Sequence, residues 1–231
     1  MVGIYQARRG ILAVQRGVLT KFEFEFGHTA TRVRRARSVW RGDEPTPGVP
    51  GGVLSGSDNR AVDNLLNLRP LRGGDEREVR EAHRVMESED FAFAPGLTAE
   101  TDWDAYCASL QLQRAGIGLP CGWVPSTFLV AEMGGRIVGR TSIRHRLTEQ
   151  LAQVGGHIGF CVLPTYRRRG YAIEILRQSL VITRKLGLSD VFVTCDESNV
   201  GSRRVIESCG GALESVVSPA PGSRVRCYRI G

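Results

Sequence analysis

Three consecutive arginines and a glycine, placed between an apolar run and a helical pattern, are the residues of this chain best suited to chemistry. They are Arg167, Arg168, Arg169 and Gly170. The first amides of a helix have no partner inside the helix, so together with loop amides they can bind a phosphate or diphosphate. Gly170 lets the backbone approach such an anion, and the arginines add positive charge. By residue type alone, a solvated arginine cluster at an ordinary turn is the simpler interpretation.

The elements on either side position this loop. A short apolar run from Ile158 to Val162 stops at Pro164, which predicts a buried strand. A helical pattern follows from Ile173 to Lys185 and ends at Gly187. We expect the inward face of that helix to include Ile175, Leu176, Ile182 and Leu186.

The spacing of Arg167, Gly170 and Ala172, directly after a strand that ends in Val-x-Pro, resembles the acyl-CoA pyrophosphate loop of the GNAT superfamily of N-acetyltransferases. The segment from Val191 to Gly211, VFVTCDESNVGSRRVIESCGG, is similar to the next strand of that superfamily and its asparagine-led helix. The wider pattern extends from about Leu68 to Ile230. The resemblance implies an α/β (α+β) fold of three layers, α/β/α, in which the two central strands of a mixed sheet splay apart to admit the cofactor.

The same resemblance implies acetyl-CoA as cosubstrate and no metal. Pantetheine would pair with the backbone of the central strand, the diphosphate would bind the loop amides, and the helix-opening asparagine would contact the pantetheine arm. That asparagine could equally be a helix cap, and the two roles are compatible. The implied cofactor-binding residues are Phe160, Cys161, Val162, Arg167, Arg168, Arg169, Gly170, Tyr171, Ala172, Asn199 and, as the other possible helix start, Ser202.

The implied reaction is direct transfer of an acetyl group to a primary amine of a small molecule or a protein. An amine with a pKa near 10.4 costs about 4 to 5 kcal/mol to hold neutral at pH 7, unless the site supplies a base or lowers that pKa. Many relatives carry a glutamate where this chain has His157, whose imidazole could accept the proton. Otherwise His157 merely ends a strand. Glu132 and His145 are reserve candidates for the base.

The chain departs from many relatives where they carry a tyrosine acid. It has Ile206 and Glu207 there, so Tyr228, Cys209 or solvent would protonate the leaving thiolate. This departure keeps a second hypothesis open, in which the domain is a non-catalytic acyl-CoA sensor or scaffold. Its basic N-terminal arm would then contact nucleic acid or a partner protein.

Composition limits the class of protein. With 231 residues, of which 42% are hydrophobic, the chain can bury one sizeable core and leave an extension. No apolar run approaches the roughly 18 residues of a membrane span, and the N-terminus lacks a signal-peptide pattern, which predicts a cytoplasmic protein with no membrane partner. The six cysteines are scattered without a C-x-x-C pair, which favours reduced core residues over disulfides or metal ligands. Cys161 and Cys209 have no obvious histidine partner in the sequence, which favours core packing over a covalent acyl-enzyme.

The positive charge gathers at the N-terminus. Residues 1–69 hold 11 Arg and Lys against 6 Asp and Glu, whereas residues 70–231 hold 20 against 18. A nearly neutral second part argues against nucleic acid as its partner. Residues 1–65 are predicted to be a basic, Gly- and Pro-rich extension that is weakly ordered or a linker, with the linker character strongest over Gly42–Asn59. Residues 66–231 are predicted to form the N-acetyltransferase domain.

The remaining elements of that domain follow from local patterns. Asp75 and Glu78 have the spacing of a capping box, and a second helix is expected to begin at Thr98 or Thr101. Trp123 lies in a turn-rich loop, where it either lines an acceptor site or covers the core. The expected strands are Leu68–Leu71, Thr127–Glu132, Arg136–Arg144, Val191–Cys195, Leu213–Val217 and Val225–Ile230. The last two form a hairpin through which a homodimer is possible.

Overall fold

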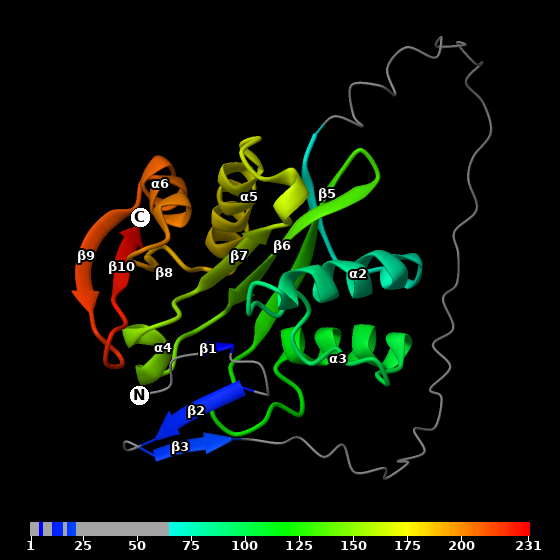
Figure 1. Ribbon diagram of the computed structural model, residues 1–231, viewed down its shortest axis with the longest axis horizontal. Coiled ribbons are helices and arrows are strands. Elements are labelled where there is room, and N and C mark those ends of the chain that lie inside the picture. The colour runs from blue at the N-terminus through cyan, green and yellow to red at the C-terminus, as the bar shows by residue number, and fades with distance from the viewer. Residues whose placement is uncertain (1–4, 7–10, 16–17, 22–64) are drawn as a thin grey trace, which may run out of the picture.

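The computed structural model describes residues 65–231 in full and, ahead of them, the backbone of three short strands (Figure 1). These are β1 (Tyr5–Gln6), β2 (Ile11–Gln15) and β3 (Val18–Lys21), which pair antiparallel in that order. The predicted linker over Gly42–Asn59 lies outside the described residues. The division of the chain at residue 65 therefore stays a prediction.

A four-stranded antiparallel sheet forms the larger half of the domain. Its spatial order is β4 (Asn67–Arg69), β5 (Ser126–Met133), β6 (Arg136–Arg144) and β7 (Ile158–Val162). Gly134 and Gly135 join β5 to β6 with φ angles of 56° and 72°. Two successive positive φ angles make the tight hairpin turn whose twist matches the strands, which is why two glycines occur there.

A second antiparallel sheet lies beside β7 in the order β8 (Val191–Asp196), β10 (Val225–Ile230) and β9 (Ala212–Val217). The two sheets are joined where β7 begins, by a bridge between Gly156 and Val193. Within residues 65–231 no ladder connects β7 to β8 beyond that point. The predicted splaying of the central strands is therefore confirmed, and it divides the sheet into two.

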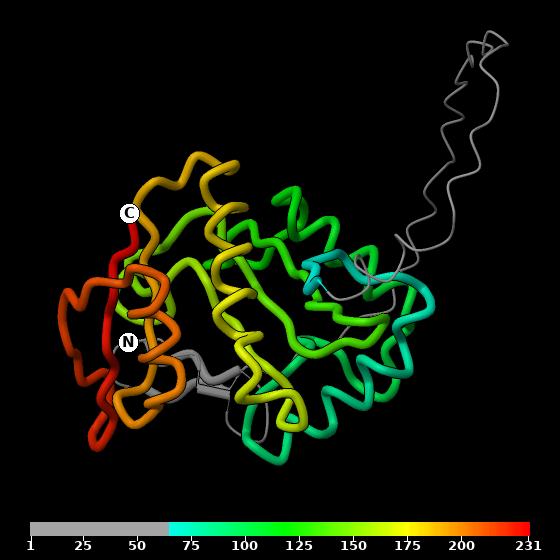
Figure 2. The backbone as a smooth tube through the Cα atoms, turned by 90° about the horizontal axis from the view of Figure 1, so that it is seen from above, coloured from blue at the N-terminus to red at the C-terminus, as the bar shows by residue number. Residues whose placement is uncertain are grey.

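Helices cover both faces, as Figures 1 and 2 show. One face carries α2 (Glu76–Glu87) and α3 (Trp103–Ala115), and the other carries α5 (Tyr171–Lys185) and α6 (Val200–Ser208). The short helix α4 (Glu149–Gln153) precedes β7. Each layer buries apolar side chains of the sheet, including Phe128 and Val130 under α2 and α3. This arrangement confirms the three-layer α+β fold.

The start of α2 differs from the predicted capping box. Asp75 closes a one-turn helix, η1 (Gly73–Asp75), and its carboxylate accepts hydrogen bonds from the Arg72 amide at 2.7 Å and from Arg69 at 2.6 Å. Glu78 accepts from the amide of Ile137 at 2.9 Å. The helix does start after Asp75, as predicted, but the capping box is wrong because both carboxylates bind groups outside α2.

Two further helix predictions are wrong. The second helix begins at Trp103 rather than at either threonine, because Asp102 accepts a hydrogen bond from the amide of Ala105 at 2.8 Å and so caps it. On α5, Leu186 is 40% exposed. It lies at the last turn, where Gly187 already leads the chain away from the sheet.

Gly139 on β6 lies tightly against β7 and α5, and it gives a test of the packing. A Cβ at this position would lie 2.3 Å from the Cys161 carbonyl oxygen and 3.1 Å from Ile175 Cδ1. We expect Gly139→Ala to lower the free energy of unfolding by about 1 to 3 kcal/mol, because a close-packed core cannot move aside without cost. Gly73→Ala, with open space around it, should change it by less than about 0.5 kcal/mol. Urea unfolding measures both, and equal midpoints would contradict the packing described.

Candidate active site

The loop between β7 and α5 presents a row of free amides. A single turn, η2 (Pro164–Tyr166), leads into it, and positive φ angles at Arg168 (64°) and Gly170 (81°) curl the backbone. Among the hydrogen bonds of residues 65–231, none uses an amide of residues 168–172. Neighbouring amides around left-handed residues form an anion-binding concavity, and this one coincides with a helix N-terminus. The loop could therefore hold a diphosphate.

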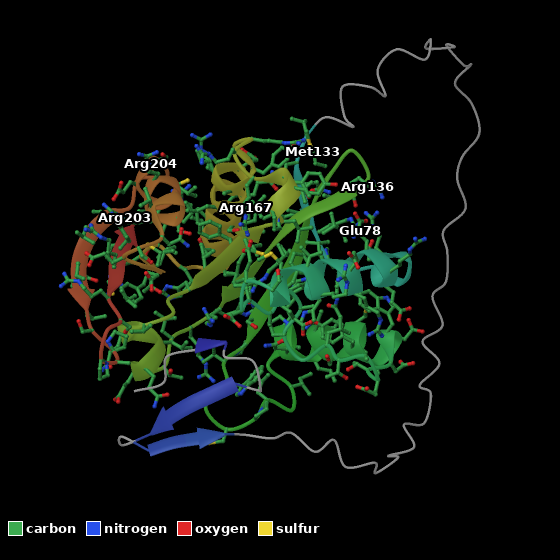
Figure 3. All side chains as sticks on the ribbon, in the orientation of Figure 1. Glu78, Met133, Arg136, Arg167, Arg203 and Arg204 are labelled. Atoms are coloured by element: carbon green, nitrogen blue, oxygen red, sulfur yellow. The ribbon has the colours of Figure 1, made fainter. Side chains whose placement is uncertain are left out.

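The three arginines of the loop have different environments. Arg167 donates to the Val162 carbonyl oxygen at 3.1 Å and to both carboxylate oxygens of Glu89, at 2.9 and 2.5 Å. This pairing lowers the pKa of Glu89. Arg169 lies over the Tyr166 ring at 5.8 Å, and neither it nor Arg168 has a carboxylate partner among the described ion pairs. Arg167, labelled in Figure 3, thus connects the loop to the segment after α2. The other two arginines add positive charge beside the free amides of residues 168–172, which together form the amide cup.

The open edge of β7 faces the splay. Two backbone hydrogen bonds lie at the ends of the ladder between β7 and β6. The Arg144 amide donates to the His157 oxygen at 2.8 Å, and the Leu163 amide donates to the Val138 oxygen at 2.9 Å. Because such bonds alternate along an antiparallel pair, the backbone groups of Phe160 point towards the splay and those of Cys161 towards β6. By the same alternation Val162 also faces the splay, but its carbonyl oxygen already accepts a hydrogen bond from Arg167. Of the three residues expected to pair with pantetheine, Phe160 therefore has both backbone groups free.

Helix α6 borders the other side of the splay. Asn199 caps it, accepting a hydrogen bond from the Ser202 amide at 2.9 Å. Asn199 is exposed, and its side-chain nitrogen has no partner among the described residues. Arg203 and Arg204, labelled in Figure 3, follow on the same helix, and the Nε of Arg203 is buried without a partner. Sequence reasoning missed these arginines, although two successive basic residues in the first turns of the helix were a usable signal.

His157 joins the two sheets. Its side chain is buried, with the residue 7% exposed, and its Nδ1 accepts a hydrogen bond from the Phe192 amide at 2.9 Å. The His157 amide donates in turn to the Phe192 oxygen at 2.6 Å. This geometry places the ring proton on Nε2 and occupies the lone pair of Nδ1. Burial, followed by the charge of Arg229, lowers the pKa of His157. The predicted base thus has no free lone pair in this structure.

The reserve candidates lie beside β5 rather than β7. Glu132 is on β5 and forms an ion pair with Arg69. His145 Nε2 lies 2.8 Å from Oγ1 of Thr127, also on β5. Strand β6 separates β5 from β7, and two strand spacings amount to about 10 Å. Neither side chain is therefore placed at the open edge of β7.

Tyr228, the predicted acid, is fully buried and donates from its hydroxyl to Glu207 Oε1 at 3.0 Å. Burial and this hydrogen bond raise its pKa, so the hydroxyl stays protonated near neutral pH. Ile206, at the position of the tyrosine in many relatives, belongs to the core. Burial also raises the pKa of the Cys161 and Cys209 thiols. Tyr228, Cys161 and Cys209 therefore keep their protons near neutral pH, and the Tyr228 hydroxyl donates its proton to a hydrogen bond with α6.

Two arginines that sequence reasoning missed lie on one face of β6. Arg140 is buried and donates to the carbonyl oxygens of Phe93 at 3.1 Å, Gly159 at 3.2 Å and Ala92 at 3.2 Å. Arg144 donates to the carbonyl oxygen of Gly156 at 2.9 Å. Residues four apart in a strand share a face. Two arginines at this spacing inside a predicted strand were a signal for a cationic stripe on one face.

Within residues 65–231 no three His, Cys, Asp or Glu side chains gather as metal ligands would. No helix in the described part of the chain is both long and apolar enough to span a bilayer.

Comparison with known proteins identifies relatives. The profile of the acetyltransferase (GNAT) domain matches residues 66–212. RimJ of Mycobacterium smegmatis, solved in complex with CoA-disulfide, is 19% identical with a TM-score of 0.54 over 73% of this chain and 82% of its own. A GNAT-family acetyltransferase of Streptococcus pneumoniae is 16% identical with a TM-score of 0.51 over 72% of this chain and 99% of its own. At these identities the structures show a common fold. No curated protein matches the chain.

The hydrogen bond between the Phe192 amide and the His157 ring can be tested by unfolding. His157→Asn keeps an acceptor near the position of Nδ1, whereas His157→Ala leaves the buried Phe192 amide unpaired. We expect the alanine variant to lose roughly 1 to 3 kcal/mol of unfolding free energy and the asparagine variant to keep most of it. Urea titration measures both. Equal losses in the two variants would mean that the hydrogen bond is not what matters.

The lowered pKa of His157 also predicts a pH dependence. The unfolded chain takes up the proton near the ordinary value of 6.5, before the folded chain does. The contribution of neutral His157 is therefore fully present above pH 6.5 and declines as the pH falls below it. His157→Asn should show a smaller decline than the wild type between about pH 6.5 and 5, since the other histidines are unchanged. Parallel stability curves would contradict this.

Proposed function

Because the chain belongs to the GNAT acetyltransferase family, whose members are acetyl-CoA-dependent enzymes, we propose that it transfers an acetyl group directly from acetyl-CoA to a primary amine of a small molecule. The observation that carries the proposal is the set of unpaired amides at residues 168–172, placed at the open end of the splay between β7 and β8. The first amides of any helix are free, but here the loop amides of residues 168–170 ahead of α5 are unpaired as well, which makes one continuous row of donors.

The cofactor would be held along one continuous path. The diphosphate binds the amides of residues 168–172, pantetheine pairs with the Phe160 backbone, and Asn199 reaches it from α6. Each helix-end interaction contributes only about 0.3 to 1 kcal/mol at an exposed site, so several must act together. Arg168 and Arg169 add charge without a competing carboxylate among the described ion pairs.

The bound thioester supplies an activated acetyl carbon, which the amine attacks as the carbon–sulfur bond breaks. The chain orients both reactants: helices α5 and α6 cover the cofactor face, so the amine would approach from the opposite face, which carries α2 and α3. His157 holds the strand on which the thioester lies. With its lone pair occupied and Tyr228 directed at Glu207, proton exchange with solvent at the open splay is the route that the geometry supports. CoA thiolate is a tolerable leaving group without an acid.

One observation favours the second hypothesis of a non-catalytic acyl-CoA sensor. Ile206 is buried where many relatives carry an acid, and the Tyr228 hydroxyl is already bonded. The N-terminal arm that would contact a partner lies outside the described residues. Binding of acetyl-CoA without release of free thiol, across a broad panel of amines, would support the sensor.

Two glycines at opposite ends of α5 provide a matched test of cofactor binding. Gly170 and Gly187 have nearly equal φ angles, 81° and 80°, and open space around both. Acetyl-CoA at about 100 times its Kd should add about 2.7 kcal/mol of stability to the wild type. For a domain of this size that raises Tm by roughly 5 to 10 °C.

Gly170→Glu should abolish this shift, because a carboxylate then faces the diphosphate, whereas Gly187→Glu should keep it. Differential scanning fluorimetry measures the shift. A wild type without any shift, confirmed by calorimetry, would sink the proposal.

A further inference from the structure

The face of β6 and β7 that points away from α5 carries two cationic side chains. Thr141 faces α5, since its Oγ1 accepts a hydrogen bond from Ser179 Oγ at 3.0 Å. Side chains alternate along a strand, so Arg140 and Arg144 face the opposite side, which α2 and α3 cover. Neither has a carboxylate partner among the ion pairs of residues 65–231. Their positive charge is therefore not neutralised by the described part of the protein.

Arg140 is a positive charge held in a fixed position by hydrogen bonds. Each nitrogen of its guanidinium donates to a backbone carbonyl, and the group lies 4.7 Å from the centre of the Phe91 ring. Burial lowers its pKa, yet it remains a cation at neutral pH because an arginine starts from so high a value. Its bond to Gly159 puts this charge beside Phe160, the residue proposed to pair with pantetheine.

Arg144 is different because part of its guanidinium is unused. Its Nη1 donates to the carbonyl oxygens of Gly156 at 2.9 Å and Gly155 at 3.3 Å. Its Nε and Nη2 have no partner among the described residues, and its side chain is partly exposed. Burial, then the charge of Arg140, lowers its pKa to about 10, so it too is charged at pH 7. One Nη is anchored, and the Nε and Nη2 edge remains to receive a planar, two-oxygen anion.

Arg144 lies on the path by which an acceptor amine would approach the cofactor. Gly155 and Gly156 directly precede His157 and β7, so the guanidinium lies at the closed end of the splay. It lies on the face opposite α5 and α6, from which the amine approaches in the proposed reaction. A cationic amine such as a polyamine would be repelled there, whereas an anionic group would be attracted.

We propose that the acceptor is a small amine that carries a carboxylate, of the amino-acid type, and that Arg144 binds this carboxylate through its Nε and Nη2. This inference rests on the proposed acetyl transfer. Pairing with Arg144 neutralises the carboxylate, so that the remaining charge of Arg140 favours the neutral amine. The site then obtains an attacking nitrogen without a dedicated base.

The test compares acceptors that differ only in this charge. Each proteinogenic L-amino acid is assayed beside its own carboxamide, with spermidine as a cationic probe, by release of free thiol from acetyl-CoA. We expect at least one amino acid to exceed its amide by about tenfold or more in kcat/KM, a ratio equivalent to one well-placed ionic hydrogen bond. Spermidine should be turned over less well than that amino acid.

Variants then assign the discrimination to Arg144. Arg144→Met should raise KM for the amino acid about tenfold, towards that of its amide, and so remove most of the difference between the two acceptors. Arg144→Lys should restore part of the difference, since it keeps the charge but loses the fork. Arg146→Met, at an exposed arginine two residues further on, is the matched control and should keep the full ratio. The thermal shift with acetyl-CoA reports in every variant that the domain is folded.

The outcomes are distinguishable. Equal turnover of acids and amides, a preference for spermidine, or an unchanged ratio in Arg144→Met would overturn the assignment of Arg144 and leave acetyl transfer standing. Acetyl-CoA binding with no amino acid accepted would likewise overturn it. Failure of acetyl-CoA to bind would overturn the proposed function and this inference together.

Discussion

Two neighbouring strands that are hydrogen-bonded at one end only are the constraint on which this structure depends. The joined end is tight: a Cβ on Gly156 would lie 2.3 Å from the Phe192 oxygen, and the φ angle of 65° there suits glycine. His157 adds a bond to the same strand. Beyond it, the Phe160 backbone loses the ladder partner that an interior strand normally has, and unpaired polar groups must be satisfied by water or a ligand. The gap between β7 and β8 can therefore bind a ligand, because its backbone groups lack the partners that a continuous ladder would supply.

The loop at the open end stays available because side chains, rather than its own amides, hold it in place. Arg167 joins it to Val162 on β7 and to Glu89 after α2. Arg168 adopts a φ of 64°, a conformation that costs a residue with a Cβ roughly 1 to 2 kcal/mol. Strain of this kind persists only where the surroundings enforce it. The cup is therefore formed before any anion arrives, and binding need not order the loop.

Local patterns predicted much of the fold. The run from Ile158 through the arginines to Gly187 gave strand, loop and helix, because periodicity and glycine punctuation are local signals. Contacts distant in sequence could not be predicted. The partner of His157 is Phe192 on another strand, and Glu78 binds Ile137 rather than the start of its own helix. The residue types suggested a catalytic base for His157 and a helix cap for Glu78. A hydrogen bond to a residue distant in sequence gives each of them a different role.

The charges of the two faces suggest how the site manages without a free base. On the face of α5, the amide cup attracts an anion; on the opposite face, Arg140 and Arg144 lack carboxylate partners among the described ion pairs. A buried cation disfavours a second one nearby, so a protonated amine would lose its proton more readily there than in water. The same field draws in a reactant with a negative group. Nucleophile activation and acceptor choice would then have one physical cause, an arginine pair that the described part of the protein leaves without a counter-ion.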